Sequence, residues 1–151
     1  MIRAVIFDWG RTLWDNDAGA LYPDAEPTLE ALAGQYRLAL CSVALESPEE
    51  RLNLIRRTGL DRYFECMRAV PRGTPKDGIL DETLAELALT PHEVAVVDDR
   101  MFRSITWGNR VGATTFWVYR GRFADELPAR ETGQPTHTIG AVADLLPILG
   151  A

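Results

Sequence analysis

Apolar runs of strand length alternate with segments of helical period along this chain, and this alternation constrains its fold more than any other feature. The predicted strands are Ala4–Phe7, Leu38–Cys41, Glu65–Ala69, Val94–Val97 and Thr115–Tyr119, and all but Glu65–Ala69 are apolar almost throughout. Between them, apolar residues recur at helical spacing in Pro27–Gly34, Pro48–Thr58 and Asp77–Leu87, and a short edge strand at Thr138–Ile139 precedes a closing helix within Ala141–Leu149. Strands that are apolar throughout are buried on both faces. The sequence therefore predicts an α/β fold of three layers, α/β/α and Rossmann-like, around a mostly parallel central sheet.

Length and composition limit the possible functions. A chain of 151 residues is expected to form one domain spanning residues 1–151. A net charge of −6 offers no basic surface for nucleic acid or anionic lipid, and no run approaches the roughly 20 apolar residues of a membrane-spanning helix. Cys41 and Cys66 stand in unrelated contexts and indicate buried thiols in a reducing compartment. We therefore expect a cytoplasmic protein that acts on a small molecule and contacts neither nucleic acid nor a membrane.

Polar residues follow the predicted strands where each strand ends. Asp8 follows the first strand and Ser42 the second, Lys76 comes after the third, and Asp98 and Asp99 follow the fourth. In an open parallel sheet, ligands bind outside the carboxyl ends of the strands. The sequence therefore predicts that these side chains converge at one edge of the sheet.

This set of side chains suits the chemistry of phosphate esters. Asp8 and Asp99 would share a hard divalent cation such as Mg²⁺ through carboxylate oxygens. Asp8 would act as a nucleophile and form an aspartyl phosphate, while Ser42 donates a hydrogen bond to a phosphoryl oxygen and Lys76 offsets the phosphate charge. The order of the residues excludes a response-regulator receiver domain, which needs its acidic pair after the first strand.

The motifs resemble those of the haloacid dehalogenase (HAD) superfamily over essentially the whole chain. The segment from Phe7 to Leu13 is similar to its first motif, Asp-x-Asp-x-Thr-Leu after an apolar strand. Leu40–Ser42 resembles the second motif, Lys76 falls where the third supplies its lysine, and Val96–Asp99 resembles the fourth. The resemblance implies a HAD-like hydrolase that uses Mg²⁺, with Asp8, Asp99, Asp98 and the backbone carbonyl of Gly10 as candidate metal ligands.

Three departures from the family pattern bear on function. Gly10 stands where most family phosphatases place a second aspartate as general acid and base, a group worth roughly 10²–10⁴-fold in rate. Arg11 replaces a usual glycine and is a candidate for binding a substrate anion, although it would equally balance the acidic charge nearby. In the family, the fourth motif has a further aspartate at a position that falls near Ser104 here, so Asp98 and Asp99 are the local acidic pair. Asp98 would either bind metal or only cap the next helix.

No segment is long enough to hold the cap domain that closes most family active sites. We therefore expect an open, capless site for a small or phosphorylated substrate, closed in part by Trp9, Trp14 and Trp107 or by a second subunit of a homo-oligomer. Arg120 and Arg122 follow the fifth strand; they would either reach the site or, as the default interpretation, be solvated.

The leading hypothesis is a Mg²⁺-dependent phosphatase or phosphoryl-transfer enzyme with Asp8 as nucleophile. Because Gly10 removes the usual acid, a dehalogenase- or phosphonatase-type hydrolase is the alternative among enzymes. Gly10, Arg11 and Ser104 also leave open a catalytically silent domain that binds a phosphorylated ligand or a protein.

Overall fold

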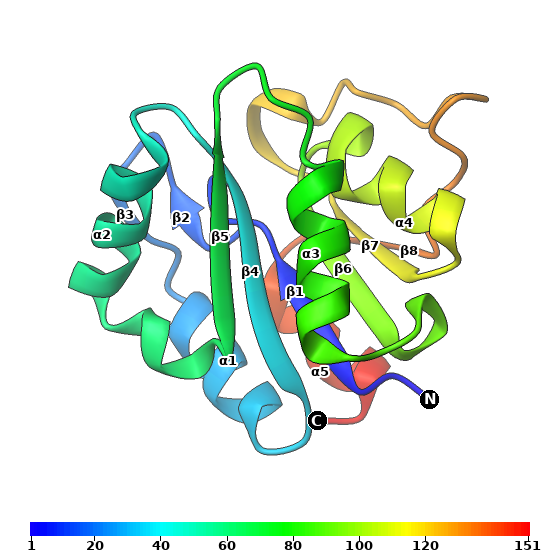
Figure 1. The fold of residues 1–151 in the computed structure, drawn as a ribbon, viewed down its shortest axis with the longest axis horizontal. Helices are drawn as coiled ribbons and strands as arrows, with labels where there is room; N and C mark the ends of the chain where they lie inside the picture. Colours follow the sequence, from blue (N-terminus) through cyan, green and yellow to red (C-terminus); the bar gives the residue numbers. More distant parts are fainter.

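The computed structural model describes residues 1–151 except for the side chain of Arg122, so the question whether Arg122 reaches the site or is solvated lies outside the described residues. Its centre is a parallel six-stranded sheet with strand order β5-β4-β1-β6-β7-β8 (Figure 1). The strands are β1 (Ala4–Phe7), β4 (Arg37–Ala44), β5 (Cys66–Pro71), β6 (Val94–Asp98), β7 (Thr114–Val118) and β8 (His137–Ile139). The predicted parallel sheet is confirmed, and all five pairings within it are parallel.

Helices cover both faces of this sheet, which makes three layers. They are α1 (Ala25–Ala33), α2 (Pro48–Thr58), α3 (Asp77–Leu87), α4 (Thr106–Val111) and α5 (Leu145–Leu149). Val5 and Phe7 of β1 pack in one apolar cluster with residues of α1, α2 and α5. Ala4 and Ile6 point to the other face, where α3 and α4 lie in front of the sheet (Figure 1). The predicted α/β/α layering is therefore correct.

Local signals set the helix boundaries where the sequence is explicit. Helix α2 begins after Ser47, whose hydroxyl accepts a hydrogen bond from the Glu50 N–H, and it ends at Gly59 with φ +80°. The predicted bounds of β1, α2 and α3 are confirmed. Other elements shift by one to three residues: α1 begins before Pro27, and the closing segment is a short 3₁₀ turn followed by α5. The largest shift is in β4, which runs to Ala44 rather than ending at Cys41.

The segment between β1 and β4 contains only a small hairpin and one helix. Strands β2 (Trp14–Asp15) and β3 (Ala20–Leu21) form the hairpin, and α1 follows. Within residues 1–151 no cap domain is therefore inserted at this point. Across the described helices, none combines the length and the apolar character needed to cross a bilayer.

Two of the three tryptophans expected to enclose the site instead belong to the interior. Trp9 and Trp107 are fully buried, and Trp107 lies in the cluster beneath α3 and α4. Trp14 is half-buried and stacks on Trp9 with ring centroids 5.8 Å apart. That prediction was wrong for Trp9 and Trp107, because burial of their large apolar surfaces stabilises the core more than exposure at a site edge would.

Candidate active site

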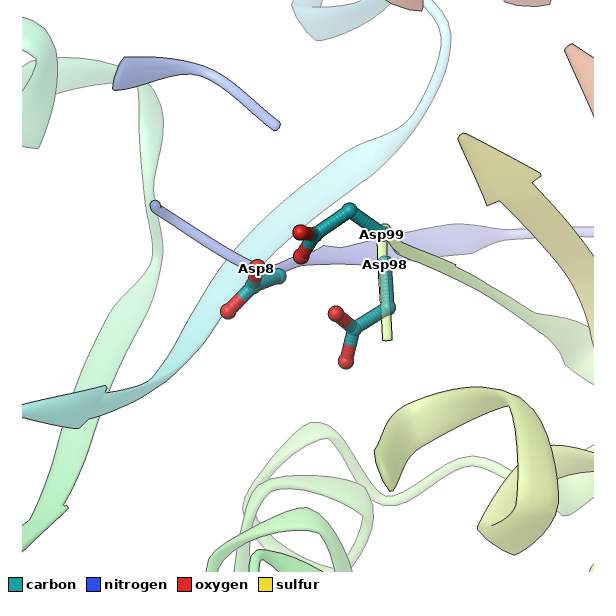
Figure 2. Close-up of side chains that lie close together, drawn as sticks. All are labelled: Asp8, Asp98 and Asp99. Atoms are coloured by element: carbon teal, nitrogen blue, oxygen red, sulfur yellow. The ribbon is translucent and has the colours of Figure 1, made fainter. Parts of the chain in front are cut away.

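Three carboxylates meet at the carboxyl edge of the sheet. Asp8 directly follows β1, and Asp98 and Asp99 stand at the end of β6, which pairs with β1 so that Phe7 lies opposite Val97. The register therefore brings the three side chains together, as Figure 2 shows. One oxygen from each carboxylate lies within 4.8 Å of the others, and all three residues are buried.

Lys76 joins this group from the loop before α3. Its ammonium is fully buried and donates to Asp8 Oδ1 at 3.0 Å and to Asp98 Oδ2 at 3.1 Å. Burial would lower the pKa of Lys76, but the charges of Asp8 and Asp98 raise it above its ordinary value. Lys76 is the only lysine in the chain, so the remaining basic side chains are all arginines. The predicted meeting of Lys76 with Asp8 is confirmed in geometry.

Both carboxylate oxygens of Asp98 accept hydrogen bonds from other groups of the protein. Besides Lys76, Asp98 accepts hydrogen bonds from the backbone N–H of Arg100 at 3.0 Å and from that of Ser104 at 3.1 Å. Burial opposes ionisation, yet Lys76 and these donors lower the pKa of Asp98 to about 2. Asp98 therefore orders the turn after β6 and orients Lys76. Of the two roles left open by the sequence, the geometry favours this capping role over metal ligation.

Asp99 differs from Asp98 because it lacks partners. Within the described residues, its Oδ2 atom is buried and forms no hydrogen bond. Burial, together with the charges of Asp8 and Asp98, raises the pKa of Asp99 to about 10. An unpaired oxygen next to a second carboxylate fits a divalent cation, which would supply the missing partner and remove the repulsion. The donor set is oxygen-rich, as Mg²⁺ prefers.

Asp8 itself is held on both sides. Thr12 Oγ1 donates to its Oδ2 at 3.2 Å, while Lys76 holds its Oδ1. Burial and the charge of Asp98 raise the pKa of Asp8, and Lys76 opposes this effect. The side chain is thus fixed in one orientation facing Asp99.

The loop after Asp8 contains two departures from the family motif, Gly10 and Arg11. Arg11 has φ +61°, the left-handed conformation that favours glycine, which is the physical reason for a glycine at this position in the motif. Its guanidinium lies 3.4 Å from the carboxylate of the exposed Asp17. A Cβ atom on Gly10 would lie 3.3 Å from the side-chain amide of Asn16. Asn16 therefore occupies the space next to the position of the missing aspartate.

Ser42 does not lie at the end of its strand, where the sequence analysis predicts it. It lies inside β4 and is fully buried, and its hydroxyl accepts a hydrogen bond at 2.5 Å from Arg51 Nη1. The prediction that Ser42 ends its strand was wrong, because the pairing of β4 with β5 continues to Ala44 opposite Pro71. Arg51, from α2, was missed because a buried arginine in a polar helix carries no signal in the sequence.

A small open cavity lies directly above the carboxylates. Its walls combine acidic, basic and apolar side chains: Asp8, Gly10, Arg11, Asn16, Val43, Leu45, Arg51, Asp99, Arg100, Arg103 and Phe123. Asp8, Asp99, Gly10 and Arg11 therefore line a common space. Ser42, Lys76 and Asp98 lie behind it and act on it through Arg51 and Asp8. Arg120 lies outside it, donating to the Thr12 carbonyl at 2.9 Å and stacking on Tyr22.

The fold and site together define a Rossmann-like α/β protein with an aspartate–lysine centre at the carboxyl edge of its sheet. A sequence model described as haloacid dehalogenase-like hydrolase matches residues 2–105, and a HAD-hydrolase-like model matches residues 71–145. The chain belongs to the haloacid dehalogenase-like hydrolase family.

Individual relatives agree with this assignment. The chain is 28% identical over 131 residues to glyceraldehyde 3-phosphate phosphatase of Methanopyrus kandleri, covering 85% of this chain and 56% of that protein. It is 31% identical over 86 residues to glycerol-3-phosphate phosphatase of Gallus gallus, covering 51% of this chain and 28% of the relative. The chain thus spans about half the length, or less, of these relatives. A HAD phosphatase structure from Thermococcus onnurineus has a TM-score of 0.76 at 18% identity, covering 99% and 98% of the two chains, which supports the fold.

Proposed function

We propose that this chain is a Mg²⁺-dependent phosphate-ester hydrolase with Asp8 as its nucleophile. The observation that carries the proposal is the unpartnered Oδ2 of Asp99, buried beside an Asp8 whose orientation Lys76 and Thr12 fix. The names of the two phosphatase relatives point to the same chemistry.

Asp8, Asp99 and the backbone carbonyl of Gly10 would hold the cation. When bound, Mg²⁺ supplies positive charge next to the phosphate and offsets the charge that develops in the transition state. The chain's own residues do the remaining work. Lys76 opposes the rise in the pKa of Asp8 by holding an ammonium 3.0 Å from its Oδ1, and Asp98 fixes Lys76 from the other side.

The reaction then has two steps. A carboxylate oxygen of Asp8 attacks phosphorus, the ester P–O bond breaks, and the alcohol leaves with a proton taken from water. Water next attacks the phosphorus of the aspartyl phosphate, the bond between phosphorus and the Asp8 oxygen breaks, and inorganic phosphate leaves. Because Gly10 supplies no acid, esters with good leaving groups should react much faster than alkyl esters.

Hydrolysis of p-nitrophenyl phosphate with saturating Mg²⁺ tests the proposal. We expect slow turnover by the wild type and a loss of at least about 100-fold in Asp8→Asn, since the amide is a poor nucleophile. Glu30→Gln, an exposed change on α1, is the matched control and should keep the rate.

Turnover that persists in Asp8→Asn would refute the covalent mechanism. Halide release from 2-chloropropionate, measured on the same samples, would favour the dehalogenase alternative. Phosphate binding without turnover of any ester would favour the silent domain.

A further inference from the structure

Arginines gather around the cavity although the chain as a whole is acidic. Arg11, Arg51, Arg100 and Arg103 all line it, against the two carboxylates of Asp8 and Asp99, in a chain with a net charge of −6. In the proposed function, Lys76 acts through Asp8, and a divalent cation would offset the charge of the phosphate. The arginines therefore exceed what a single phosphate group requires.

Three of the four pair with a carboxylate. Arg51 pairs with Glu46 at 3.0 Å. Arg100 pairs with Glu126 through Nε at 2.8 Å and Nη2 at 2.7 Å, and its guanidinium lies 3.7 Å from the centre of the Phe123 ring. Arg11 contacts Asp17 at 3.4 Å. These contacts account for much of the charge of Arg100, and they tie Arg11 to its own loop.

Arg51 is buried and held in one orientation. Its Nε donates to Glu46 at 3.0 Å, and its Nη1 donates to Ser42 Oγ at 2.5 Å and to the Val43 carbonyl at 3.2 Å. The residue is only 6% exposed, yet it lines the cavity. Within the described residues, its hydrogen bonds are made by Nε and Nη1, and none is made by Nη2. A guanidinium fixed in this way is preorganised to receive an anion, because little side-chain entropy is lost on binding.

Arg103 contributes a charge that the protein does not neutralise. In the part of the chain that the structure describes, no carboxylate pairs with its side chain, although it lines the same cavity. It stands in the turn after β6, where Asp98 holds the neighbouring Ser104 N–H. Its backbone, at φ −115° and ψ −112°, interrupts the surrounding helical turn. The turn therefore places an unpaired cation in the wall of the cavity that Asp8 also lines.

We infer that Arg51 and Arg103 bind a second anionic group of the substrate, carried on the same small molecule as the phosphate ester. This inference rests on the proposed function, and it narrows the substrate class to short phosphorylated acids or bisphosphates. Leu45 and Phe123 add apolar surface to the same walls, which suits a short carbon chain between the two anions. Such a substrate engages both the carboxylate–lysine centre and the arginines, whereas a simple alkyl phosphate leaves the arginines unused.

Three probes of matched length test this inference: 3-phosphonooxypropanoate, propane-1,3-diyl bisphosphate and propyl phosphate. We expect kcat/KM for at least one of the two doubly anionic esters to exceed that for propyl phosphate by about 10- to 100-fold, as for a charge-assisted, bidentate contact. The two doubly anionic probes distinguish a carboxylate from a second phosphate. Arg103→Gln should reduce the preference about 10-fold, mainly through KM.

Matched variants separate recognition from folding. Arg51→Gln should also reduce the preference for doubly anionic esters. Because Arg51 is buried, this variant disturbs the fold more than Arg103→Gln does, and Arg103→Gln alone tests the inference if Arg51→Gln does not fold. Arg56→Gln, on the same helix as Arg51 but exposed, is the control and should retain the preference.

Calorimetric binding of the same three probes to Asp8→Asn, with Mg²⁺ present, gives a readout that does not need turnover. The inference is supported if a doubly anionic probe binds more tightly than propyl phosphate and Arg103→Gln weakens that binding. This holds even if no ester is hydrolysed, because the absence of hydrolysis would refute only the proposed function. Hydrolysis of all three esters at similar kcat/KM overturns the inference and leaves the proposed function standing. Absence of both binding and turnover overturns both.

Discussion

Replacing Asp99 with asparagine should stabilise the metal-free protein while abolishing its response to Mg²⁺. Asp99 is buried next to Asp8 and Asp98, and these surroundings raise its pKa from 3.8 to about 10. At neutral pH the folded protein must therefore keep a proton on Asp99 that the unfolded chain has lost. Asparagine has nearly the same shape and carries no charge, so it removes this penalty.

The size of the effect follows from the two pKa values. Each pH unit above the ordinary value of 3.8 costs the folded state about 1.4 kcal/mol, so at pH 7 the penalty is at most about 4 kcal/mol. The pKa of Asp99 is higher in the folded protein than in the unfolded chain. Below about pH 4 the contribution of Asp99 to the free energy of unfolding is therefore fully present, and it is lost as the pH rises toward about 10. Asp99→Asn should therefore match the wild type near pH 4 and exceed it at pH 7, by up to about 10 °C in Tm.

Thermal unfolding between pH 4 and pH 9, in EDTA and then in excess Mg²⁺, measures both effects. Mg²⁺ should raise the Tm of the wild type because it binds only the folded protein, and it should leave the Tm of Asp99→Asn nearly unchanged. Glu30→Gln, an exposed change of the same charge, controls for the loss of one negative charge. A variant that is less stable than the wild type at pH 7 in EDTA, or that keeps the full response to Mg²⁺, would refute the reasoning.

Two further predictions concern the neighbours of Asp8. Gly10→Asp should raise turnover of alkyl phosphates at least about 10-fold and of aryl phosphates less, because poor leaving groups need a proton most; Asn16, 3.3 Å from the new Cβ, must move aside. Gly10→Asn is the matched control, and an equal gain there would show that acid catalysis is not the cause. Lys76→Met should abolish turnover and reduce the free energy of unfolding in EDTA by about 3–5 kcal/mol, because it leaves buried Asp8 and Asp98 without their shared cation. Urea unfolding checks this, and an unchanged midpoint and slope would contradict it.

The placement of Asp8, Lys76 and the Asp98–Asp99 pair could be predicted from the sequence alone. The aspartates stand at the ends of apolar runs, Lys76 falls where the third family motif supplies its lysine, and the carboxyl ends of parallel strands lie on the same edge of a sheet. Strand order was not needed for that prediction, because every strand of a parallel sheet points the same way. The bounds of α2 and α3 were equally accessible, since a proline at the start of α2 and a glycine after its end act locally.

The roles of Asp98 and Asp99 could not be separated in the same way. The two carboxylates are adjacent in sequence, so neither spacing nor composition distinguishes them. Only the packed structure shows that Lys76 and two backbone N–H groups satisfy Asp98 while Asp99 Oδ2 stays unpaired. Their pKa values consequently move in opposite directions, because one buried carboxylate has donors and the other has only negative neighbours.

The sequence by itself determined the α/β alternation and the set of side chains at the edge of the sheet, because both follow from local periodicity and strand direction. Tertiary structure alone decided which side chains face the cavity. Ser42 is buried behind Arg51, Trp9 and Trp107 turn into the core, and Arg103 meets no carboxylate among the described residues. Each of these outcomes depends on distances between segments remote in the chain, and such distances are fixed only when the helices pack onto the sheet.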